Sequence, residues 1–247
     1  LNLGSFMGFA SKLDNHEHLK FKKMIAQPNP LIYNTDDIFE LLKEEDLILH
    51  HPFESFDPVV EIVKEAAADP EVLAIKQSLY RVSGNSPLIK HLTTAAENGK
   101  QVTVLVELKA RFDEEQNIAW AKKLEEAGCH VIYGIKGLKV HAKALLIVRA
   151  EKEGIKRYVH MSTGNYNDKT AELYTDMALM TSKDNFASDI AGLFNLLTGY
   201  SKPPEWKLLS VAPLELRDDF LKLIEGEINN AKNGLEAKII AKMNALV

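Results

Sequence analysis

Apolar positions along the chain follow two spacings, one typical of strands and one typical of helices. Short apolar runs rich in β-branched residues predict strands at residues 47–50, 72–79, 101–108, 130–133, 142–148 and 177–180. Apolar positions three and four residues apart predict helices at residues 36–42, 57–67, 87–97, 114–127, 187–197 and 214–230. Because strands and helices alternate, we expect an α/β sandwich with a mixed, mostly parallel sheet flanked by helices.

Proline, glycine and short polar residues mark the boundaries of these elements. Ser55 and Asp57 are candidate caps for the helix at 57–67, and Gly128 closes the helix at 114–127. The proline-rich stretch at 201–204 predicts a domain boundary. The apolar run at 239–247 predicts one more strand, whose unpaired edge would promote association.

Composition narrows the class of protein only a little. A chain of 247 residues with 46% apolar content can bury a sizeable core, and the single cysteine, Cys129, rules out a disulfide framework. No signal peptide and no apolar run of about 20 residues is present, so the sequence gives no sign of membrane association and a cytoplasmic protein is expected. The net charge of −5 argues against broad electrostatic capture of polyanions such as nucleic acids, so positive charge must act locally.

The segment from Gly137 to Lys143 contains the strongest candidate chemistry. His141 and Lys143 are two residues apart at the start of the predicted strand at 142–148, and such residues face the same side of a sheet. A neutral imidazole can attack phosphorus at neutral pH, and a lysine beside it can neutralise phosphate oxygens. The alternative is a histidine bonded to a carbonyl at a strand end, beside a surface lysine.

A loop rich in short polar residues, His160 to Asn167, follows. Glycine at position 164 lets the backbone approach a ligand closely, and the neighbouring hydroxyl and amide groups can bond phosphate oxygens. We interpret His160 as a residue at the end of a strand with structural hydrogen bonds, rather than as a second catalytic histidine.

The order of His-x-Lys, strand and Gly-Asn loop resembles one half-site of the phospholipase D-like superfamily, and it implies a phospholipase D-like fold. The usual motif continues to an aspartate five residues after the lysine, where this chain has Val148. Blocks at 50–57, 75–81, 106–114, 163–167 and 173–176 complete the pattern. Together they resemble the bacterial polyphosphate kinases that use a phosphohistidine, over residues 36–247.

This resemblance implies reversible transfer of the terminal phosphate of ATP to inorganic polyphosphate, with ADP as the other product and Mg²⁺ as cofactor. It also implies a homo-oligomer of the full-length protein. Residues 1–20 would be the tail of a preceding helical domain, 21–205 the first phospholipase D-like catalytic domain, and 206–247 the start of a second, truncated one. The second active-site histidine would lie beyond this chain, so the chain alone is expected to be inactive.

The resemblance also assigns residues. His141 would be the phosphohistidine nucleophile and Lys143 its catalytic partner, while Arg81, Arg111, Tyr174, Asn165 and Asn167 would bind ATP or phosphate. Arg81 and Arg111 follow neighbouring predicted strands, so they could converge on one phosphate, with magnesium nearby and linked through phosphate or water. The alternative is that each arginine pairs with a local carboxylate, and that Tyr174 is a packing residue.

Two further assignments rest on residue type. Asp176 could orient His141 by accepting from its second ring nitrogen. His50 and His51 suggest a zinc site, but neither a cysteine nor a third ligand stands at a suitable spacing, so zinc is rejected.

Two other functions compete with the kinase. A phosphodiesterase of the phospholipase D type would share the His-x-Lys chemistry but should carry the aspartate that Val148 replaces. A non-catalytic domain that binds polyphosphate or partners would fit a chain with only one half-site.

Overall fold

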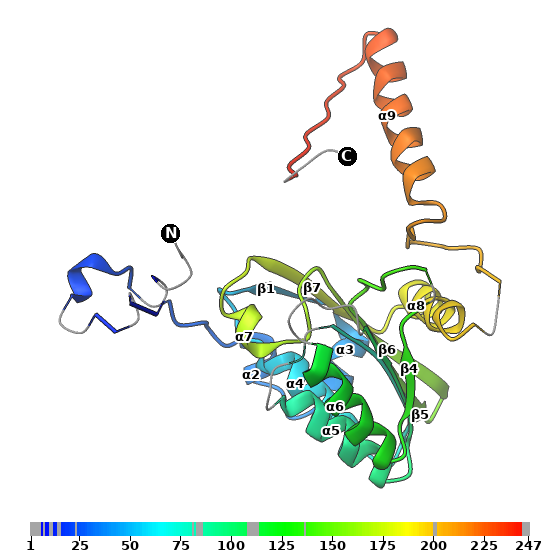
Figure 1. The fold of residues 1–247 in the computed structure, drawn as a ribbon. Coiled ribbons are helices and arrows are strands. Elements are labelled where there is room, and N and C mark those ends of the chain that lie inside the picture. Colours follow the sequence, from blue (N-terminus) through cyan, green and yellow to red (C-terminus); the bar gives the residue numbers. More distant parts are fainter. Residues whose placement is uncertain are drawn as a thin grey trace.

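The computed structural model describes residues 6, 8–9, 12–13, 16–22, 24–80, 82, 86–107, 114–135, 137–199 and 202–243 (Figure 1). Arg81 and Arg111 lie outside the described residues. The helical elements are η1 Glu17–Leu19, α2 Pro30–Tyr33, α3 Ile38–Glu44, α4 Asp57–Ala68, α5 Pro87–Glu97, α6 Glu114–Glu126, α7 Asp168–Ala171, α8 Asp184–Leu197 and α9 Leu216–Lys232. The strands are β1 Leu47–His51, β2 Val72–Leu79, β3 Gln101–Val106, β4 His130–Tyr133, β5 Ala144–Glu151, β6 Gly154–Ser162 and β7 Asp176–Thr181.

The described strands form a single mixed sheet in the order β1-β7-β6-β5-β2-β3-β4. The prediction of a mixed sheet flanked by helices is confirmed, but the prediction that it is mostly parallel is wrong. Only the pairs β2–β3 and β3–β4 are parallel, whereas β1–β7, β6–β7, β5–β6 and β2–β5 are antiparallel. Parallel pairing needs a crossover connection, which α5 and α6 supply for β2, β3 and β4 alone.

Strand β6 is absent from the predicted elements. Its residues 154–162 include Lys156, Arg157 and His160, and its first four positions are exposed or only partly buried. The strand therefore lacks the continuous apolar run or the strict alternation from which a strand is predicted. It nevertheless pairs along its length with β5, through a hairpin whose turn is at residues 152–153.

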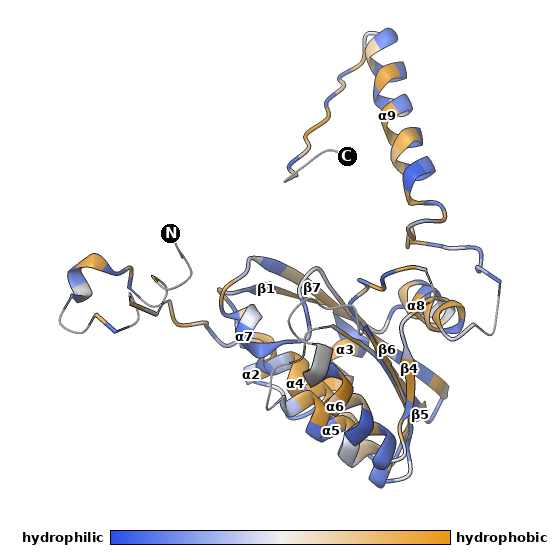
Figure 2. Cartoon of the chain, in the orientation of Figure 1, coloured by the Kyte–Doolittle hydropathy of each residue, from blue (hydrophilic) through white to orange (hydrophobic). Residues whose placement is uncertain are grey.

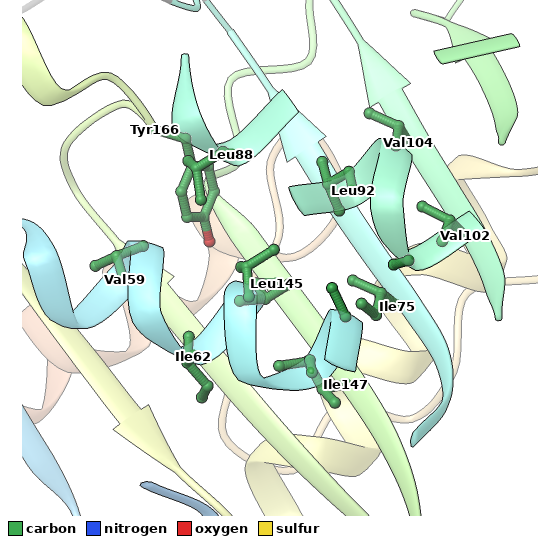
Figure 3. Packing of buried hydrophobic residues seen from close by; sticks show 14 of the residues in the cluster. Val59, Ile62, Ile75, Leu88, Leu92, Val102, Val104, Leu145, Ile147 and Tyr166 are labelled. Atoms are coloured by element: carbon green, nitrogen blue, oxygen red, sulfur yellow. The ribbon is translucent and has the colours of Figure 1, made fainter. Parts of the chain in front are cut away.

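The main core lies between the sheet and helices α3 to α6, and Figure 3 shows part of it. Ile75, Leu145 and Ile147 point from adjacent strands toward Ile62 of α4 and Leu92 of α5, and all five are fully buried. Apolar residues recur on α4 and α5 at the helical period, so each helix presents one continuous face to the sheet (Figure 2).

A second, smaller core covers the other face of β5 and β6. Helix α8 packs there through Ile190 and Phe194, together with Trp206 from the segment after it. The carboxylate of Asp189 accepts hydrogen bonds from the backbone N–H groups of residues 207, 208 and 209, at 2.7–3.1 Å. The segment that follows the predicted boundary at 201–204 is therefore fixed to α8.

Helix α9 confirms the predicted helix at 214–230, but none of its residues is buried. Phe220 and Leu223 are more than half exposed, and Leu221, Ile224 and Ile228 are each more than a third exposed. The predicted strand at 239–247 is not found in its described part: residues 239–243 belong to no helix or strand and are exposed. Residues 244–247 lie outside the described residues. None of the strand pairings of the described chain includes residues 239–243. This segment therefore has no neighbouring strand to bond its backbone N–H and C=O groups.

Candidate active site

Several of the candidate site residues lie at one end of the sheet. The pairing register aligns the carboxyl ends of β1, β2, β3 and β6 with the first residues of β5 and β7. Lys143, for example, precedes β5, and its carbonyl accepts a hydrogen bond from Ser162 N–H at 3.1 Å. The short helix α7, which follows the loop after β6, lies at the same end (Figure 1).

His141 and Lys143 lie together at this end. The ammonium nitrogen Nζ of Lys143 is 2.9 Å from each ring nitrogen of His141 and donates to the His141 carbonyl at 2.7 Å. The two side chains therefore lie together, as the spacing predicts, although not through alternation along a strand. The strand itself begins later than predicted, at Ala144, so both residues belong to the connection that leads into β5. His141 is exposed, whereas Lys143 is buried.

Tyr80 provides the surface on which this pair rests. Its ring meets the His141 ring edge-on, with centroids 5.2 Å apart and an interplanar angle of 74°. The ammonium of Lys143 lies 5.4 Å from the Tyr80 ring centroid, and that of Lys139 lies 5.0 Å from it. Tyr80 follows β2 directly and is itself buried. The sequence contains it in the block at 75–81, but nothing in its residue type predicts this contact.

Lys143 is the titratable group most affected by this setting. Burial lowers its pKa from 10.5 to about 8, the nearby Asp176 carboxylate acts in the opposite direction, and the Lys139 ammonium lowers it further. Burial raises the free energy of the charged ammonium, and an anion that binds beside it lowers that free energy strongly. The site therefore favours a group that brings negative charge close to Lys143.

The Gly-Asn loop is built around Asp176. The Thr163 hydroxyl donates to Asp176 Oδ1 at 2.8 Å and accepts from the Met177 N–H at 3.1 Å. A Cβ on Gly164 would lie 2.6 Å from Asp176 Oδ2, too close for any side chain. Glycine is thus required here to admit the Asp176 carboxylate, a reason that differs from the close ligand approach expected from the sequence. Orientation of His141 by Asp176 stays a prediction.

His160 has the structural role expected of it. It is 1% exposed in β6, and its Nδ1 lies 2.8 Å from the Tyr166 hydroxyl. Burial lowers the pKa of His160 to about 3, with a smaller contribution from His51, so its ring is neutral at physiological pH. Tyr166 in turn packs in the main core (Figure 3).

The remaining candidates among the described residues lie before, at the start of and after α7. Asn167 caps α7, because its side-chain oxygen accepts from Lys169 N–H at 3.0 Å and Thr170 N–H at 3.1 Å. Asn165 is partly buried in the loop before α7, and Tyr174 is 61% exposed after it. Their contacts with phosphate or nucleotide stay predictions, as do those of Arg81 and Arg111.

His51 and the residues that follow it make hydrogen bonds with their near neighbours in the sequence. His51 Nδ1 lies 2.9 Å from the Glu54 carbonyl, and the Ser55 hydroxyl accepts from Asp57 N–H at 3.1 Å, at the first turn of α4. The N-cap of α4 is Phe56, which makes no side-chain cap hydrogen bond, so the prediction that Ser55 and Asp57 cap this helix is wrong; their contact is local to residues 55–57. Among the described residues no group of three or more His, Cys, Asp or Glu side chains could hold a metal ion. The described part of the site therefore does not by itself supply the set of oxygen ligands that a cage for Mg²⁺ needs.

Comparisons with known proteins identify the family of this chain. Residues 37–203 match the family model described as polyphosphate kinase C-terminal domain 1, and residues 209–247 match polyphosphate kinase C-terminal domain 2. The polyphosphate kinases of Halalkalibacterium halodurans and Bacillus cereus are 57% and 55% identical to this chain over 94% of its length. Both matches cover 33% of the relative, so the chain spans about a third of the length of these proteins.

A solved structure matches the fold as well. Polyphosphate kinase from Porphyromonas gingivalis is 36% identical, with a TM-score of 0.79 over 90% of this chain and 37% of the other. The fold and these matches define the class as a C-terminal domain of a kinase, built on a mixed α/β sheet. The chain belongs to the polyphosphate kinase family. No helix in the part of the chain that the structure describes is long and apolar enough to cross a membrane.

Proposed function

We propose that this chain carries the nucleophilic half of a polyphosphate kinase active site, which transfers the terminal phosphate of ATP reversibly to polyphosphate through phosphohistidine 141. The observation that supports this most directly is the buried ammonium of Lys143 within 2.9 Å of both ring nitrogens of His141. It places a positive charge beside the imidazole, within reach of the oxygens of a phosphoryl group bonded to that ring.

The reaction has two steps. A ring nitrogen of neutral His141 attacks the γ-phosphorus of ATP, the new P–N bond forms, the bond to the bridging oxygen breaks, and ADP leaves. The P–N bond then breaks as a terminal phosphate oxygen of polyphosphate attacks the same phosphorus. In both steps Lys143 offsets charge on the phosphoryl oxygens, because its ammonium lies beside the attacking ring.

Other residues complete the proposal. Arg81 follows Tyr80, so it is well placed by sequence to bind phosphate, and Arg111 would approach from beyond β3. Asn165 and Asn167 would donate their amide N–H groups to phosphate oxygens, and Tyr174 would contact the nucleotide. Mg²⁺ would accompany the phosphates of ATP and be held through phosphate or water, since the described side chains form no ligand cage for it.

The proposal extends to the organisation of the whole protein. Residues 1–20 would end a preceding helical domain, 21–205 form the first catalytic domain, and 206–247 begin the second. The full-length protein would be a cytoplasmic homo-oligomer. Without the remainder of the second domain, this chain would bind ATP or polyphosphate weakly and turn over negligibly, because water would surround His141 on its open side.

The alternative function, a phosphodiesterase, is not supported by the residue at position 148, which is valine where the phospholipase D motif has aspartate. This residue lies within β5, pairs with Ala74 and Arg157, and packs against the smaller core under α8. An aspartate there would be removed from the site and desolvated, so the usual phospholipase D motif has no counterpart in this strand.

The test is to give the natural full-length protein ATP, magnesium and short polyphosphate, and in parallel a chromogenic phosphodiester. Growth of polyphosphate with stoichiometric ADP, and no diester cleavage, supports the kinase. Diester hydrolysis without polyphosphate synthesis would reject it.

A further inference from the structure

Glu107 is a buried carboxylate at the end of β3, adjacent to the site but outside the reaction as described above. Only 2% of its surface is exposed. Its Oε2 accepts a hydrogen bond from the Val140 N–H at 2.8 Å. Gly134 lies beside the carboxylate, since a Cβ there would be in ordinary van der Waals contact with both of its oxygens, at 3.7 Å.

The backbone of Glu107 is fixed on two sides. Its N–H donates to the Leu79 carbonyl at 3.1 Å, and its carbonyl accepts from Asn117 Nδ2 of α6 at 3.1 Å. Leu79 ends β2 and directly precedes Tyr80, against which the His141 ring rests. The position of the Glu107 side chain is therefore determined by the same two strands that place Tyr80.

The residue that Glu107 holds is next to the nucleophile. Val140 is 7% exposed and lies in the connection from β4 to β5, which carries Lys139, His141 and Lys143 outside any strand. A hydrogen bond from a backbone N–H to a buried carboxylate is short and strong compared with one between neutral groups. One residue farther along the chain, the imidazole contacts both the Tyr80 ring and the Lys143 ammonium.

We propose that Glu107 is a positioning residue for the phosphoryl-accepting histidine: through Val140 N–H it holds the His141 imidazole against Tyr80 and Lys143. This inference rests on the function proposed above. In this role Glu107 acts through the Val140 backbone N–H and is not a reacting group. It acts by fixing the attack geometry, and a displacement of about 1 Å at a reacting group can cost about a hundredfold in rate.

Two substitutions separate position from charge. Glu107→Ala removes the acceptor, so the connection loses its tether and phosphoenzyme formation should slow by about a hundredfold. Glu107→Gln keeps a side-chain oxygen at the same distance and should retain part of the rate, because a neutral acceptor bonds more weakly than a carboxylate. Glu125→Ala is the matched control. It also removes one carboxylate near β4, but Glu125 bonds the Tyr133 hydroxyl at 2.8 Å on the surface, away from Val140.

The experiment is rapid-quench labelling of the natural full-length protein with γ-labelled ATP over a range of ATP concentrations. The rate at saturation should fall for Glu107→Ala and less for Glu107→Gln, while the ATP concentration for half-maximal rate changes by less than about twofold. Glu125→Ala should behave as wild type. A uniform rise in the half-maximal concentration, or a wild-type rate in folded Glu107→Ala, would overturn the inference. If Glu107→Ala does not fold, a wild-type rate in the isosteric Glu107→Gln overturns it instead.

A second readout separates this inference from the proposed function. In the 247-residue chain labelled with ¹³C on histidine, the ring Cε1–H signal of His141, assigned by its absence in His141→Ala, reports the rings and charges beside it. Glu107→Ala should shift and broaden this signal, and Glu125→Ala should not. An unchanged signal contradicts the positioning role. Absence of label on wild-type protein, with the signal still shifted in Glu107→Ala, would reject the phosphohistidine and leave the tether standing.

Discussion

The lowered pKa of Lys143 predicts how phosphate binding depends on pH. Its pKa of about 8 means that the ammonium is mostly charged at pH 7 and mostly neutral at pH 9. A bound phosphate favours the charged form, so affinity should be nearly full at pH 7 and below and should fall as the pH rises through 8. This is the direction expected when only the protonated lysine binds the anion.

The size of the effect follows from the protonated fraction. With a pKa of about 8, that fraction falls from about 0.9 at pH 7 to about 0.1 at pH 9. Affinity for a phosphate ligand should therefore fall about tenfold, or about 1.4 kcal/mol, across those two pH units. Lysines with ordinary pKa values remain charged throughout this range and contribute no such change.

The assay is calorimetric titration of this chain with cyclic trimetaphosphate, which has no ionisable group in the window, at constant ionic strength from pH 6.5 to 9.5. Lys143→Arg is the control, because a guanidinium stays protonated and its affinity curve should be flat. A wild-type affinity that stays nearly constant up to pH 9, or the same decline in Lys143→Arg, would refute the assignment of this titration to Lys143.

Three other predictions concern the site and its support. His160 stays neutral in the folded chain, so below pH 6.5 protons bind preferentially to the unfolded chain. The free energy of unfolding, measured with urea, should therefore fall by about 2 kcal/mol between pH 7 and pH 5. This loss should disappear in His160→Asn. Gly164→Ala must displace the Asp176 carboxylate and should lower the free energy of unfolding by on the order of 1–3 kcal/mol. Gly226→Ala is the control: it lies on α9 with nothing within 4 Å of its Cβ, so it should be neutral or stabilising. Equal melting temperatures of the two variants would contradict this prediction. In the full-length protein, Arg81→Ala and Arg111→Ala should each lose on the order of 2–4 kcal/mol of transition-state stabilisation, with partial recovery for lysine, and unchanged turnover would remove that arginine from the phosphate site.

Periodicity predicted the helices well because their apolar faces are complete within each segment. Helix α5 begins and ends where expected, at Pro87 and Glu97, and α4 extends only one residue beyond its predicted end. Strand order is a different kind of information. Nothing in β2 indicates that it lies between β3 and β5, and so the predominance of antiparallel pairs could not be predicted from the strands one by one.

The contacts of the candidate site are likewise of two kinds, those local in the sequence and those made through strand pairing. The proximity of His141 and Lys143 is local and follows from a spacing of two residues. Tyr80 and Glu107 reach the same place only through the pairing of β2 with β3 and β5, and their contacts with His141 and Val140 join distant parts of the sequence. Asn167 shows the converse, since a side chain expected on phosphate uses its oxygen to cap a short helix that periodicity could not predict.

The central claim is that His141 carries the phosphate, and mapping the labelled residue tests it most directly. The natural full-length protein, mixed with ATP and magnesium and quenched in base, should yield a peptide phosphorylated on His141, with label that is lost in acid and stable in base. His141→Ala should carry no label, whereas His160→Asn, if folded, should keep it on residue 141. Label that persists in His141→Ala, or that maps to another residue, would contradict the account.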